Sequence, residues 1–312
     1  MTQTLAIGRY NPADRAALVD TFGTTVVCKP SALAELGSDL RAGILAVAYM
    51  GHHAFGGAQM DLLPNLQVIA NYGVGFDAID VAAASARGIK VTNTPDVLND
   101  DVADLAIAMW LMQGRQMRAA EAHVRSGDWA KNGPVPLNRK LSGGAAGIMG
   151  MGRIGRDIAD RLAAFKMDIH YHARSKKATP GWTYHADPAE LAKAVDFMFV
   201  ALVGGPETEK YVSAEVIKAL GPQGVIINIS RGSVIDEEAL LNALESGEIA
   251  GAGLDVFVGE PQVNPRFLGL DNVVLQPHQG SATVQTRAAM AQLQRDNIAA
   301  HLRGADLLTP VN

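Results

Sequence analysis

Short runs of apolar residues alternate with helical stretches along nearly all of the 312-residue chain. The first series of runs lies within residues 1–95 and predicts five strands, at residues 5–7, 25–28, 44–49, 66–70 and 89–91. Helical stretches lie between them, for example at residues 13–21 and 78–87. Strands that alternate with helices indicate a parallel sheet covered on both faces.

A second and clearer series predicts six strands, at residues 146–149, 168–171, 197–202, 225–229, 251–256 and 273–275. Helical patterns separate most of them, at residues 153–165, 188–195 and 237–246. Six strands in this order match a doubly wound nucleotide-binding sheet. The sequence therefore predicts the fold class α/β, with two Rossmann-like parallel-sheet domains.

Two further helices organise these series into domains. A long helix is predicted over residues 100–117, with Asn99 or Asp100 as its N-cap and with apolar residues at helical spacing: Val102, Leu105, Ala106, Met109 and Met112. A last helix over residues 283–302 is expected to return to the first domain. We therefore predict a discontinuous substrate-binding domain, residues 1–98 and 283–312, and a nucleotide-binding domain, residues 99–282.

The composition narrows the class of protein. Hydrophobic residues make up 48% of the chain, charged residues 19%, and the net charge is −5 without a long basic run. Bulk electrostatic attraction to nucleic acid or to an anionic membrane is therefore not expected. No apolar run reaches the roughly 18 residues of a membrane span, and the N-terminus does not resemble a signal peptide. We expect a cytoplasmic protein. The single Cys28 excludes an intramolecular disulfide and is predicted to be a small buried residue of its strand.

A glycine motif marks a candidate nucleotide site. Residues 147–155 contain Gly150-x-Gly152-x-x-Gly155, after an apolar strand and at the start of a helix. Gly150 allows a tight turn, Gly152 lets the backbone approach a diphosphate, and Gly155 allows close packing of helix on strand. The diphosphate would lie on the N–H groups of the helix start, at Arg153 and Ile154.

The residues after the next predicted strand, 168–171, indicate which dinucleotide binds. An acidic residue about 20 positions after the glycines would hold the ribose 2′-OH of NAD. This chain instead has Arg174, Ser175 and Lys176 there, and no carboxylate follows the strand. The positive charges and hydrogen-bond donors of these side chains suit the 2′-phosphate of NADP(H). A solvated basic turn is the alternative interpretation, but the position favours NADP(H), with NAD(H) as the second choice.

Three polar residues lie at or soon after the ends of later predicted strands. They are Arg231, Glu260 and His278. Ligands of open α/β sheets bind at the carboxyl ends of the strands. Taken singly, each residue has an ordinary structural explanation, as a surface ion pair, a turn or a capped loop. Together they predict a cation, a carboxylate and an imidazole that can hold a 2-keto acid and deliver a proton to it.

These motifs together resemble the D-isomer-specific 2-hydroxyacid dehydrogenase family over most of the chain. The matching segments include Asn-Ile-Ser-Arg-Gly at 228–232, Gly-Glu-Pro at 259–261 and Pro-His at 277–278, with residues 71–80, 93–104, 147–155 and 254–257. Within the family, the basic turn most resembles NADPH-preferring glyoxylate/hydroxypyruvate and hydroxyphenylpyruvate reductases. The resemblance implies a homodimer formed largely through the nucleotide domains. Gln279-Gly280 is a minor departure, since many members have Ile-Gly there.

The resemblance also implies roles for individual residues. His278 would donate the proton while Glu260 orients its ring and favours its charged form, because a free histidine has a pKa of about 6.5. Arg231 would bind the substrate carboxylate and polarise the keto oxygen. The remaining expected contacts are the N–H groups of Val74 and Gly75 for the substrate carboxylate, Asp255 near the nicotinamide (or capping a neighbouring turn), and Leu202, Ile229 and Gly280 for the cofactor.

Other residues carry weaker expectations. His52, His53, His170 and His172 form no metal-ligand pattern, and His170 and His172 are predicted to lack a nearby partner. No metal is expected. In related reductases the excursion that holds Trp129 reaches the partner subunit, and Trp129 is predicted to approach the active site there.

The predicted activity is NADPH-dependent reduction of a small 2-keto acid, glyoxylate or hydroxypyruvate, to the D-2-hydroxy acid. The alternatives are reduction of bulkier aromatic keto acids such as phenylpyruvate, or a dinucleotide-sensing interaction protein on the same fold. Oxidation of phosphoglycerate is disfavoured because the usual regulatory C-terminal domain is missing. Oxidation of formate or phosphite is disfavoured by the basic turn. Turnover with keto acids would separate an enzyme from a sensor.

Overall fold

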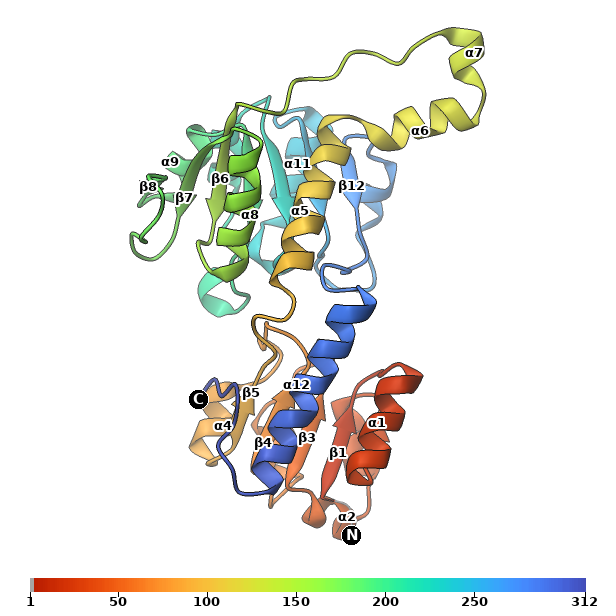
Figure 1. Ribbon diagram of the computed structural model, residues 1–312, viewed down its shortest axis with the longest axis vertical. Coiled ribbons are helices and arrows are strands. Elements are labelled where there is room, and N and C mark those ends of the chain that lie inside the picture. The colour runs from red at the N-terminus through yellow and green to blue at the C-terminus, as the bar shows by residue number, and fades with distance from the viewer. Residues whose placement is uncertain (1–2) are drawn as a thin grey trace. The chain divides into compact units, whose positions relative to one another are not determined.

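The computed structural model describes residues 3–312, so Met1 and Thr2 of the N-terminal segment considered above lie outside the described residues. The chain forms two compact units. One runs to Leu98 and resumes at Ala282–Asn312, and the other is Asn99–Ser281. Each contains a parallel sheet with helices on its faces (Figure 1). The predicted α/β class with two parallel-sheet domains, the first of them discontinuous, is confirmed.

The first unit contains a five-stranded sheet in the order β2-β1-β3-β4-β5. Every neighbouring pair of its strands is parallel. Its strands are β1 (Thr4–Ile7), β2 (Thr25–Val27), β3 (Ala46–Tyr49), β4 (Val68–Asn71) and β5 (Lys90–Thr92). Its helices are α1 (Pro12–Phe22), α2 (Ser38–Gly43), α3 (Gly57–Asp61), α4 (Val81–Ala86), the 3-10 helix η1 (Pro30–Glu35) and α12 (Val284–Leu302).

The last helix, α12, completes the first unit. Thr283 is its N-cap, and Ile298 is fully buried in a cluster with Ala6, Ala46 and Ala48 of the sheet. Its Gln294 side chain donates to the carbonyl oxygens of Tyr49 at 3.1 Å and Ala70 at 2.8 Å. These contacts hold the C-terminal helix on the strands of the N-terminal segment.

The second unit contains a seven-stranded parallel sheet in the order β12-β11-β10-β9-β6-β7-β8. Its strands are β6 (Ala145–Met149), β7 (Asp168–His172), β8 (Thr183–His185), β9 (Phe197–Val200), β10 (Val225–Asn228), β11 (Gly251–Leu254) and β12 (Val273–Leu275). Strands β7 and β8 follow β6 towards one edge of the sheet, and β10, β11 and β12 follow β9 towards the other edge. The pair β6–β9 is therefore the switch point, beside which ligands bind in doubly wound sheets.

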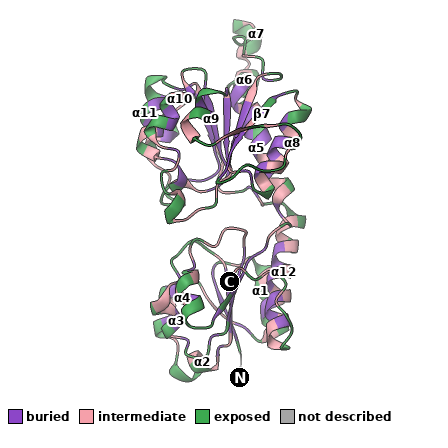
Figure 2. Ribbon diagram, turned by 90° about the vertical axis from the view of Figure 1, so that its left-hand side faces the viewer, coloured by how far each residue is buried: buried purple, intermediate pink, exposed green. Residues whose placement is uncertain are grey.

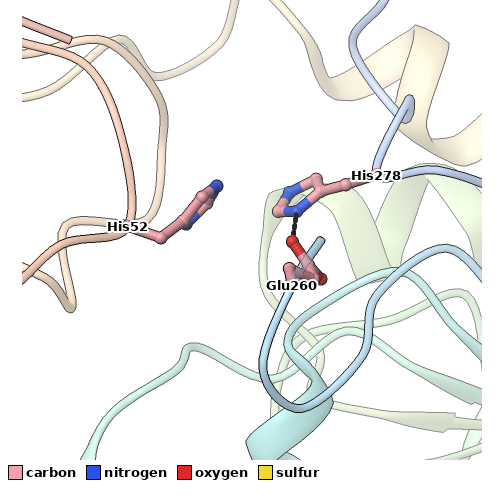
Figure 3. Close-up of side chains that lie close together, drawn as sticks. All are labelled: His52, Glu260 and His278. Atoms are coloured by element: carbon pink, nitrogen blue, oxygen red, sulfur yellow. Dashed lines mark hydrogen bonds and ion pairs between the residues drawn. The ribbon is translucent and has the colours of Figure 1, made fainter. Parts of the chain in front are cut away.

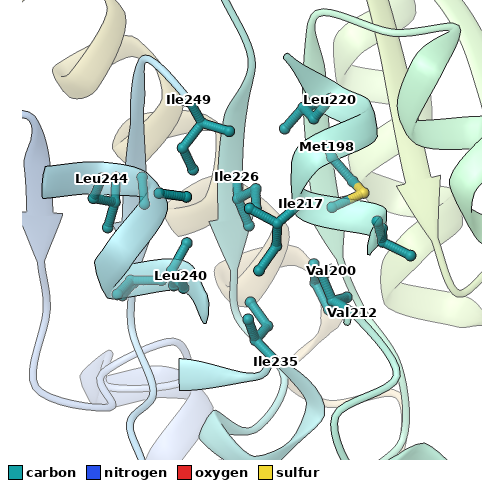
Figure 4. Packing of buried hydrophobic residues seen from close by; sticks show 14 of the residues in the cluster. Met198, Val200, Val212, Ile217, Leu220, Ile226, Ile235, Leu240, Leu244 and Ile249 are labelled. Carbon is teal, nitrogen blue, oxygen red and sulfur yellow. The ribbon is translucent and has the colours of Figure 1, made fainter. Parts of the chain in front are cut away.

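Helices cover both faces of this sheet (Figures 1 and 2). They are α5 (Asn99–Gly114), α8 (Arg153–Ala164), α9 (Pro188–Lys193), α10 (Ala214–Leu220) and α11 (Glu237–Ser246). Helices α6 (Met117–Arg125) and α7 (Asp128–Asn132) lie on an excursion that projects away from the sheet (Figure 1). The 3-10 turns are η2 (Pro206–Thr208), η3 (Gly232–Val234) and η4 (Pro265–Gly269). Side chains of α10, α11 and the central strands form one core, seen around Ile217 and Ile226 in Figure 4.

Three local predictions were wrong. The predicted helix over 100–117 is two helices, because α5 ends at Gly114 and Gln116 has the left-handed φ of 48°. Strand β8 was not predicted, since Thr-Tyr-His at the edge of the sheet is not an apolar run. Cys28 is exposed, because β2 is an edge strand that ends at Val27. In the part of the chain that the structure describes, no helix has the length and apolar character to span a membrane.

Candidate active site

The predicted cofactor and catalytic residues of the second unit lie at one edge of its sheet. All its strands are parallel, so their carboxyl ends meet there. The glycine loop follows β6, the basic turn follows β7, Arg231 follows β10, and Asp255 follows β11. His278 and Gly280 follow β12. Leu202 and Ile229 follow β9 and β10, and they are half-buried and buried, respectively. The order of the strands thus assembles residues that are more than 100 positions apart.

The glycine loop has the shape that a dinucleotide diphosphate needs. Gly150 has a φ of 106°, and a Cβ there would lie 2.7 Å from the carbonyl oxygen of Ala201. A Cβ at Gly155 would lie 2.1 Å from the carbonyl oxygen of Gly150, so helix and strand pack directly. A Cβ at Gly152 would meet nothing within 4 Å. Gly152 is also the N-cap of α8 and makes no side-chain capping bond. The open side of the loop therefore fits an anion at the helix start.

The basic turn between β7 and β8 presents its side chains to solvent. Arg174, Ser175 and Lys176 are all exposed. Lys177 Nζ donates to Ser175 Oγ at 3.2 Å. No carboxylate lies in residues 173–182. The turn can therefore offer positive charge and hydroxyl donors to a phosphate.

Glu260 and His278 form a hydrogen-bonded pair (Figure 3). His278 Nδ1 lies 2.6 Å from Glu260 Oε2, and the side chains are 31% and 19% exposed, respectively. The other carboxylate oxygen of Glu260 accepts the N–H of Phe257 at 2.8 Å. Glu260 is thus held at both oxygens, and its hydrogen bond to Nδ1 fixes the orientation of the His278 ring.

The backbone of His278 is held in an unusual conformation. Its φ is 50°, in the left-handed region that residues other than glycine rarely adopt. Its N–H donates to the carbonyl oxygen of Asp255 at 2.8 Å. Strained residues of this kind are found most often at functional sites, where the surroundings hold them in place.

Asp255 helps to hold the backbone around His278 in this conformation. Its carboxylate accepts the N–H of Gln279 at 2.8 Å and the N–H of Gly280 at 2.9 Å. The residue is 1% exposed. Burial raises the pKa of this carboxyl group, and the two backbone hydrogen bonds oppose that shift. Of the two arrangements considered for Asp255, the structure shows it capping the turn after His278. Contact with a nicotinamide stays a prediction.

Arg231 is half-buried and lies three residues beyond the end of β10. Its Nη1 donates to the carbonyl oxygen of Ser230 at 2.8 Å. The buried Asn228 side chain holds the turn from inside, since its Nδ2 donates to the carbonyl oxygen of Arg231 at 3.0 Å and its Oδ1 accepts the N–H of Ser230 at 3.0 Å. These hydrogen bonds fix the backbone that carries the Arg231 guanidinium at the end of the strand.

The Arg231 turn also packs directly on the segment that leads to Glu260. A Cβ at Gly232 would lie 2.0 Å from the carbonyl carbon of Phe257. Glu237 Oε2 accepts the N–H of Val258 at 3.1 Å, and Oε1 accepts Asn264 Nδ2 at 3.5 Å. Asn228, Gly232 and Glu237 were not predicted from the sequence to support the site. A polar Asn228 at the end of an apolar strand was the available signal.

The predicted substrate contacts of the first unit lie in the turn after β4. Asn71 Nδ2 donates to the carbonyl oxygens of Gly73 at 3.0 Å and Gly75 at 2.9 Å. Asn93 Nδ2 donates to the carbonyl oxygen of Val74 at 2.9 Å. Within the described residues, the N–H groups of Val74 and Gly75 donate to no other protein group. With their carbonyl oxygens held by asparagines, these two N–H groups are suited to bind an anion.

The prediction that His170 and His172 lack nearby partners was wrong. His170 Nδ1 lies 2.9 Å from His185 Nε2, and His172 Nε2 lies 2.8 Å from the Tyr211 hydroxyl. The unpredicted strand β8 brings His185 into place. The pKa of His185 is lowered, first by burial and then by the neighbouring His170. These contacts hold the edge of the sheet together.

Comparison with known proteins places the chain in a family. Residues 107–280, all within the second unit, match the model of the D-isomer specific 2-hydroxyacid dehydrogenase, NAD binding domain. The hydroxyphenylpyruvate reductase of Plectranthus scutellarioides is 48% identical over 81% of this chain and 80% of its own length. The glyoxylate/hydroxypyruvate reductase A of Arabidopsis thaliana is 47% identical over 80% of this chain and 79% of its own length.

Solved structures agree with this assignment. An NADPH-dependent glyoxylate/hydroxypyruvate reductase from Sinorhizobium meliloti, solved in complex with NADP and malonate, superposes with a TM-score of 0.94 at 43% identity. The match covers 100% of this chain and 97% of that one. A 2-hydroxyacid dehydrogenase from Ketogulonicigenium vulgare gives a TM-score of 0.91 at 47% identity, over 100% and 99% of the two chains. The chain belongs to the D-isomer specific 2-hydroxyacid dehydrogenases, a family of oxidoreductases that bind a nicotinamide dinucleotide.

Proposed function

We propose that this protein reduces a small 2-keto acid, glyoxylate or hydroxypyruvate, to the D-2-hydroxy acid with NADPH. The observation that carries the proposal is the Glu260–His278 pair at the carboxyl edge of the nucleotide-binding sheet. Relatives at 47% and 44% identity are named glyoxylate/hydroxypyruvate reductase and glyoxylate reductase, which supports this substrate class.

The second unit would hold the cofactor. The diphosphate would lie on the start of α8 at Gly152, Arg153 and Ile154, where the loop leaves space. Arg174, Ser175 and Lys176 would bind the 2′-phosphate. A bound nicotinamide supplies the hydride that the keto carbon accepts. Asp255, which follows β11, and Gly280, in the turn after β12, would line the nicotinamide end of the site.

His278 would donate the proton to the oxygen that becomes the hydroxyl group. Glu260 accepts from Nδ1, so it orients the ring and stabilises the positive charge of the protonated imidazole. The ring nitrogen that faces away from Glu260 is then the donor. A positioned acid of this kind contributes about 10²- to 10⁴-fold to the rate.

Arg231 and the turn after β4 would bind the substrate. A guanidinium offers two parallel donors to a carboxylate, and its charge also polarises the adjacent keto oxygen. The N–H groups of Val74 and Gly75, in the first unit, would donate hydrogen bonds to the oxygens of the substrate carboxylate. A substrate held at both its carboxylate and its keto oxygen would present one face of the keto carbon to the nicotinamide, which is the physical basis for a single stereoisomer as product.

Replacing His278 by glutamine tests the proton donor. Glutamine keeps the approximate size and polarity but cannot carry a transferable proton, so kcat should fall by about 10²- to 10⁴-fold. NADPH binding, followed by fluorescence titration, should be nearly unchanged. His301→Gln, which changes a histidine that contacts Gln67, is the matched control. Retained turnover in His278→Gln would exclude this role for His278.

Replacing Arg174 by alanine tests the cofactor preference. Loss of a charged hydrogen bond to phosphate costs about 1.5–3 kcal/mol, so the Kd for NADPH should rise by about 10- to 100-fold. The Kd for NADH should hardly change, because NADH has no 2′-phosphate. Lys193→Ala on α9 removes an exposed positive charge elsewhere on the same unit and is the control. An equal effect on both cofactors would contradict the assignment.

Two finer features belong to the proposal. Aromatic keto acids are the second candidate substrates, because the relative named hydroxyphenylpyruvate reductase is 48% identical. A homodimer is supported by the exposed apolar side chains of the excursion after α5, including Met117, Val124 and Trp129. Trp129, which is 60% exposed, would approach the active site of the partner subunit.

A further inference from the structure

A buried tyrosine hydroxyl lies under the basic turn. Tyr171 of β7 is fully buried, and its hydroxyl donates to the carbonyl oxygen of Lys177 at 3.1 Å. The same hydroxyl accepts the N–H of Lys177 at 2.9 Å. One side chain therefore holds both backbone groups of a residue six positions further along the chain. The backbone between them must form a closed loop, which contains Arg174, Ser175 and Lys176.

The rest of the turn has few other restraints. Residues 173–182 contain no helix or strand, so no ladder of backbone hydrogen bonds fixes them. Tyr184 donates its hydroxyl to the carbonyl oxygen of Ala173 at 3.2 Å. Arg156 donates to the carbonyl oxygen of Ala178 and lies over the Trp182 ring, 5.4 Å from its centre. Tyr184 and Arg156 therefore bind the loop at Ala173 and Ala178, and the Tyr171 hydroxyl binds it at Lys177.

The hydrogen bonds between Tyr171 and Lys177 order the backbone of residues 174–176 and leave their side chains exposed to a phosphate. Residues 174–177 are exposed, while Tyr171 and Ala173 beneath them are buried. Fixing one residue's backbone costs about 1–2 kcal/mol of conformational entropy. A loop that is ordered before the ligand arrives does not lose that entropy on binding, and its affinity is correspondingly higher. Lys177 Nζ also donates to Ser175 Oγ, so the closed loop extends its order to a side chain.

We propose that Tyr171 is a positioning residue for cofactor specificity, because its hydroxyl holds the loop of Arg174, Ser175 and Lys176 in the shape that binds a 2′-phosphate. The inference rests on the proposed NADPH dependence. The aromatic ring itself packs against Tyr184, with ring centres 5.4 Å apart, and that packing does not need the hydroxyl. Removing only the hydroxyl therefore separates closure of the loop from filling of the core.

The test uses Tyr171→Phe in the full chain. Two neutral hydrogen bonds of about 1 kcal/mol each are lost, and water can replace part of them at the exposed Lys177, so the Kd for NADPH should rise by about five- to tenfold. The Kd for NADH should stay within about twofold. Tyr211→Phe is the matched control, because it removes a hydroxyl that bonds His172 and does not touch the loop. Fluorescence titration of each variant with both cofactors gives the ratio of the two Kd values.

A double-mutant cycle shows whether Tyr171 acts through the phosphate ligands. In an Arg174→Ala background, Tyr171→Phe should raise the Kd for NADPH by less than it does alone, because the two changes remove the same interaction. A wild-type protein that binds NADPH no more tightly than NADH overturns the proposed cofactor and this inference with it. A wild-type preference that Tyr171→Phe leaves intact overturns this inference alone. Equal weakening of both cofactors also overturns it, since that pattern indicates a general loss of structure.

Discussion

Replacing Gly232 by alanine tests whether the turns that carry Arg231 and Glu260 must keep one fixed spacing. The added Cβ would lie 2.0 Å from the carbonyl carbon of Phe257 and 2.4 Å from the nitrogen of Val258. Ordinary van der Waals contact begins at 3.4 Å. Both neighbours are backbone atoms, so no side-chain rotation relieves the clash. One of the two turns must therefore move by more than about 1 Å, a displacement that can cost about 10²-fold in rate.

The expected result is a folded enzyme with impaired catalysis. Overpacking typically costs about 1–3 kcal/mol, so the free energy of unfolding measured with urea should fall by that amount. The value of kcat should fall by about 10²-fold. NADPH affinity should remain within about twofold, because the glycine loop and the basic turn do not touch Gly232. Gly269→Ala, whose Cβ would meet nothing within 4 Å, is the control. A loss of stability with unchanged kcat would show that catalysis does not depend on the spacing between the two turns.

Two further predictions concern the turn after β12 and the edge of the sheet. Asp255→Asn replaces one carboxylate oxygen by an amide NH₂ group, which then faces a backbone N–H. Because a charged hydrogen bond is lost, kcat should fall by about 10- to 100-fold. Unchanged steady-state kinetics would contradict the proposal that Asp255 holds His278 in place. The pKa of His185 lies below its ordinary value of 6.5, so the unfolded chain binds more protons below that pH and the folded protein loses stability as the pH falls. His185→Gln should flatten this decline in Tm below about pH 6.5, and an unaltered slope would show that another group causes it.

The strands were predictable where both faces of the sheet are covered. Those strands are continuous apolar runs, and the interior strand β10, predicted at residues 225–229, is observed at Val225–Asn228. Edge strands expose one side, so their sequences carry less of this signal. For that reason β8 was missed and Cys28, next to the edge strand β2, was expected to be buried. The break between α5 and α6 depends on the left-handed conformation of Gln116, which no pattern of apolar residues records.

The candidate site was predictable as a set of residues but not as a geometry. Glycine spacing and the polar residues at strand ends located the glycine loop and the Glu260–His278 pair. The residues that hold them were harder to identify, because their role depends on contacts between distant segments. Asn228 and Glu237 act on neighbouring turns through side-chain hydrogen bonds to the backbone, and Gly232 acts by having no side chain. Tyr171 was part of an apolar strand, and its hydroxyl gained a role only once β8 and the turn were in place.

The proposed NADPH-dependent reduction of a 2-keto acid is tested by measuring initial rates of NADPH and NADH oxidation with glyoxylate, hydroxypyruvate and phenylpyruvate. We expect rapid turnover with NADPH, slower turnover with NADH, and higher kcat/KM for glyoxylate or hydroxypyruvate than for phenylpyruvate. A faster reaction with phenylpyruvate would move the assignment to aromatic keto acids. Tight NADPH binding without turnover of any of the three acids would contradict the account and favour a dinucleotide-sensing protein.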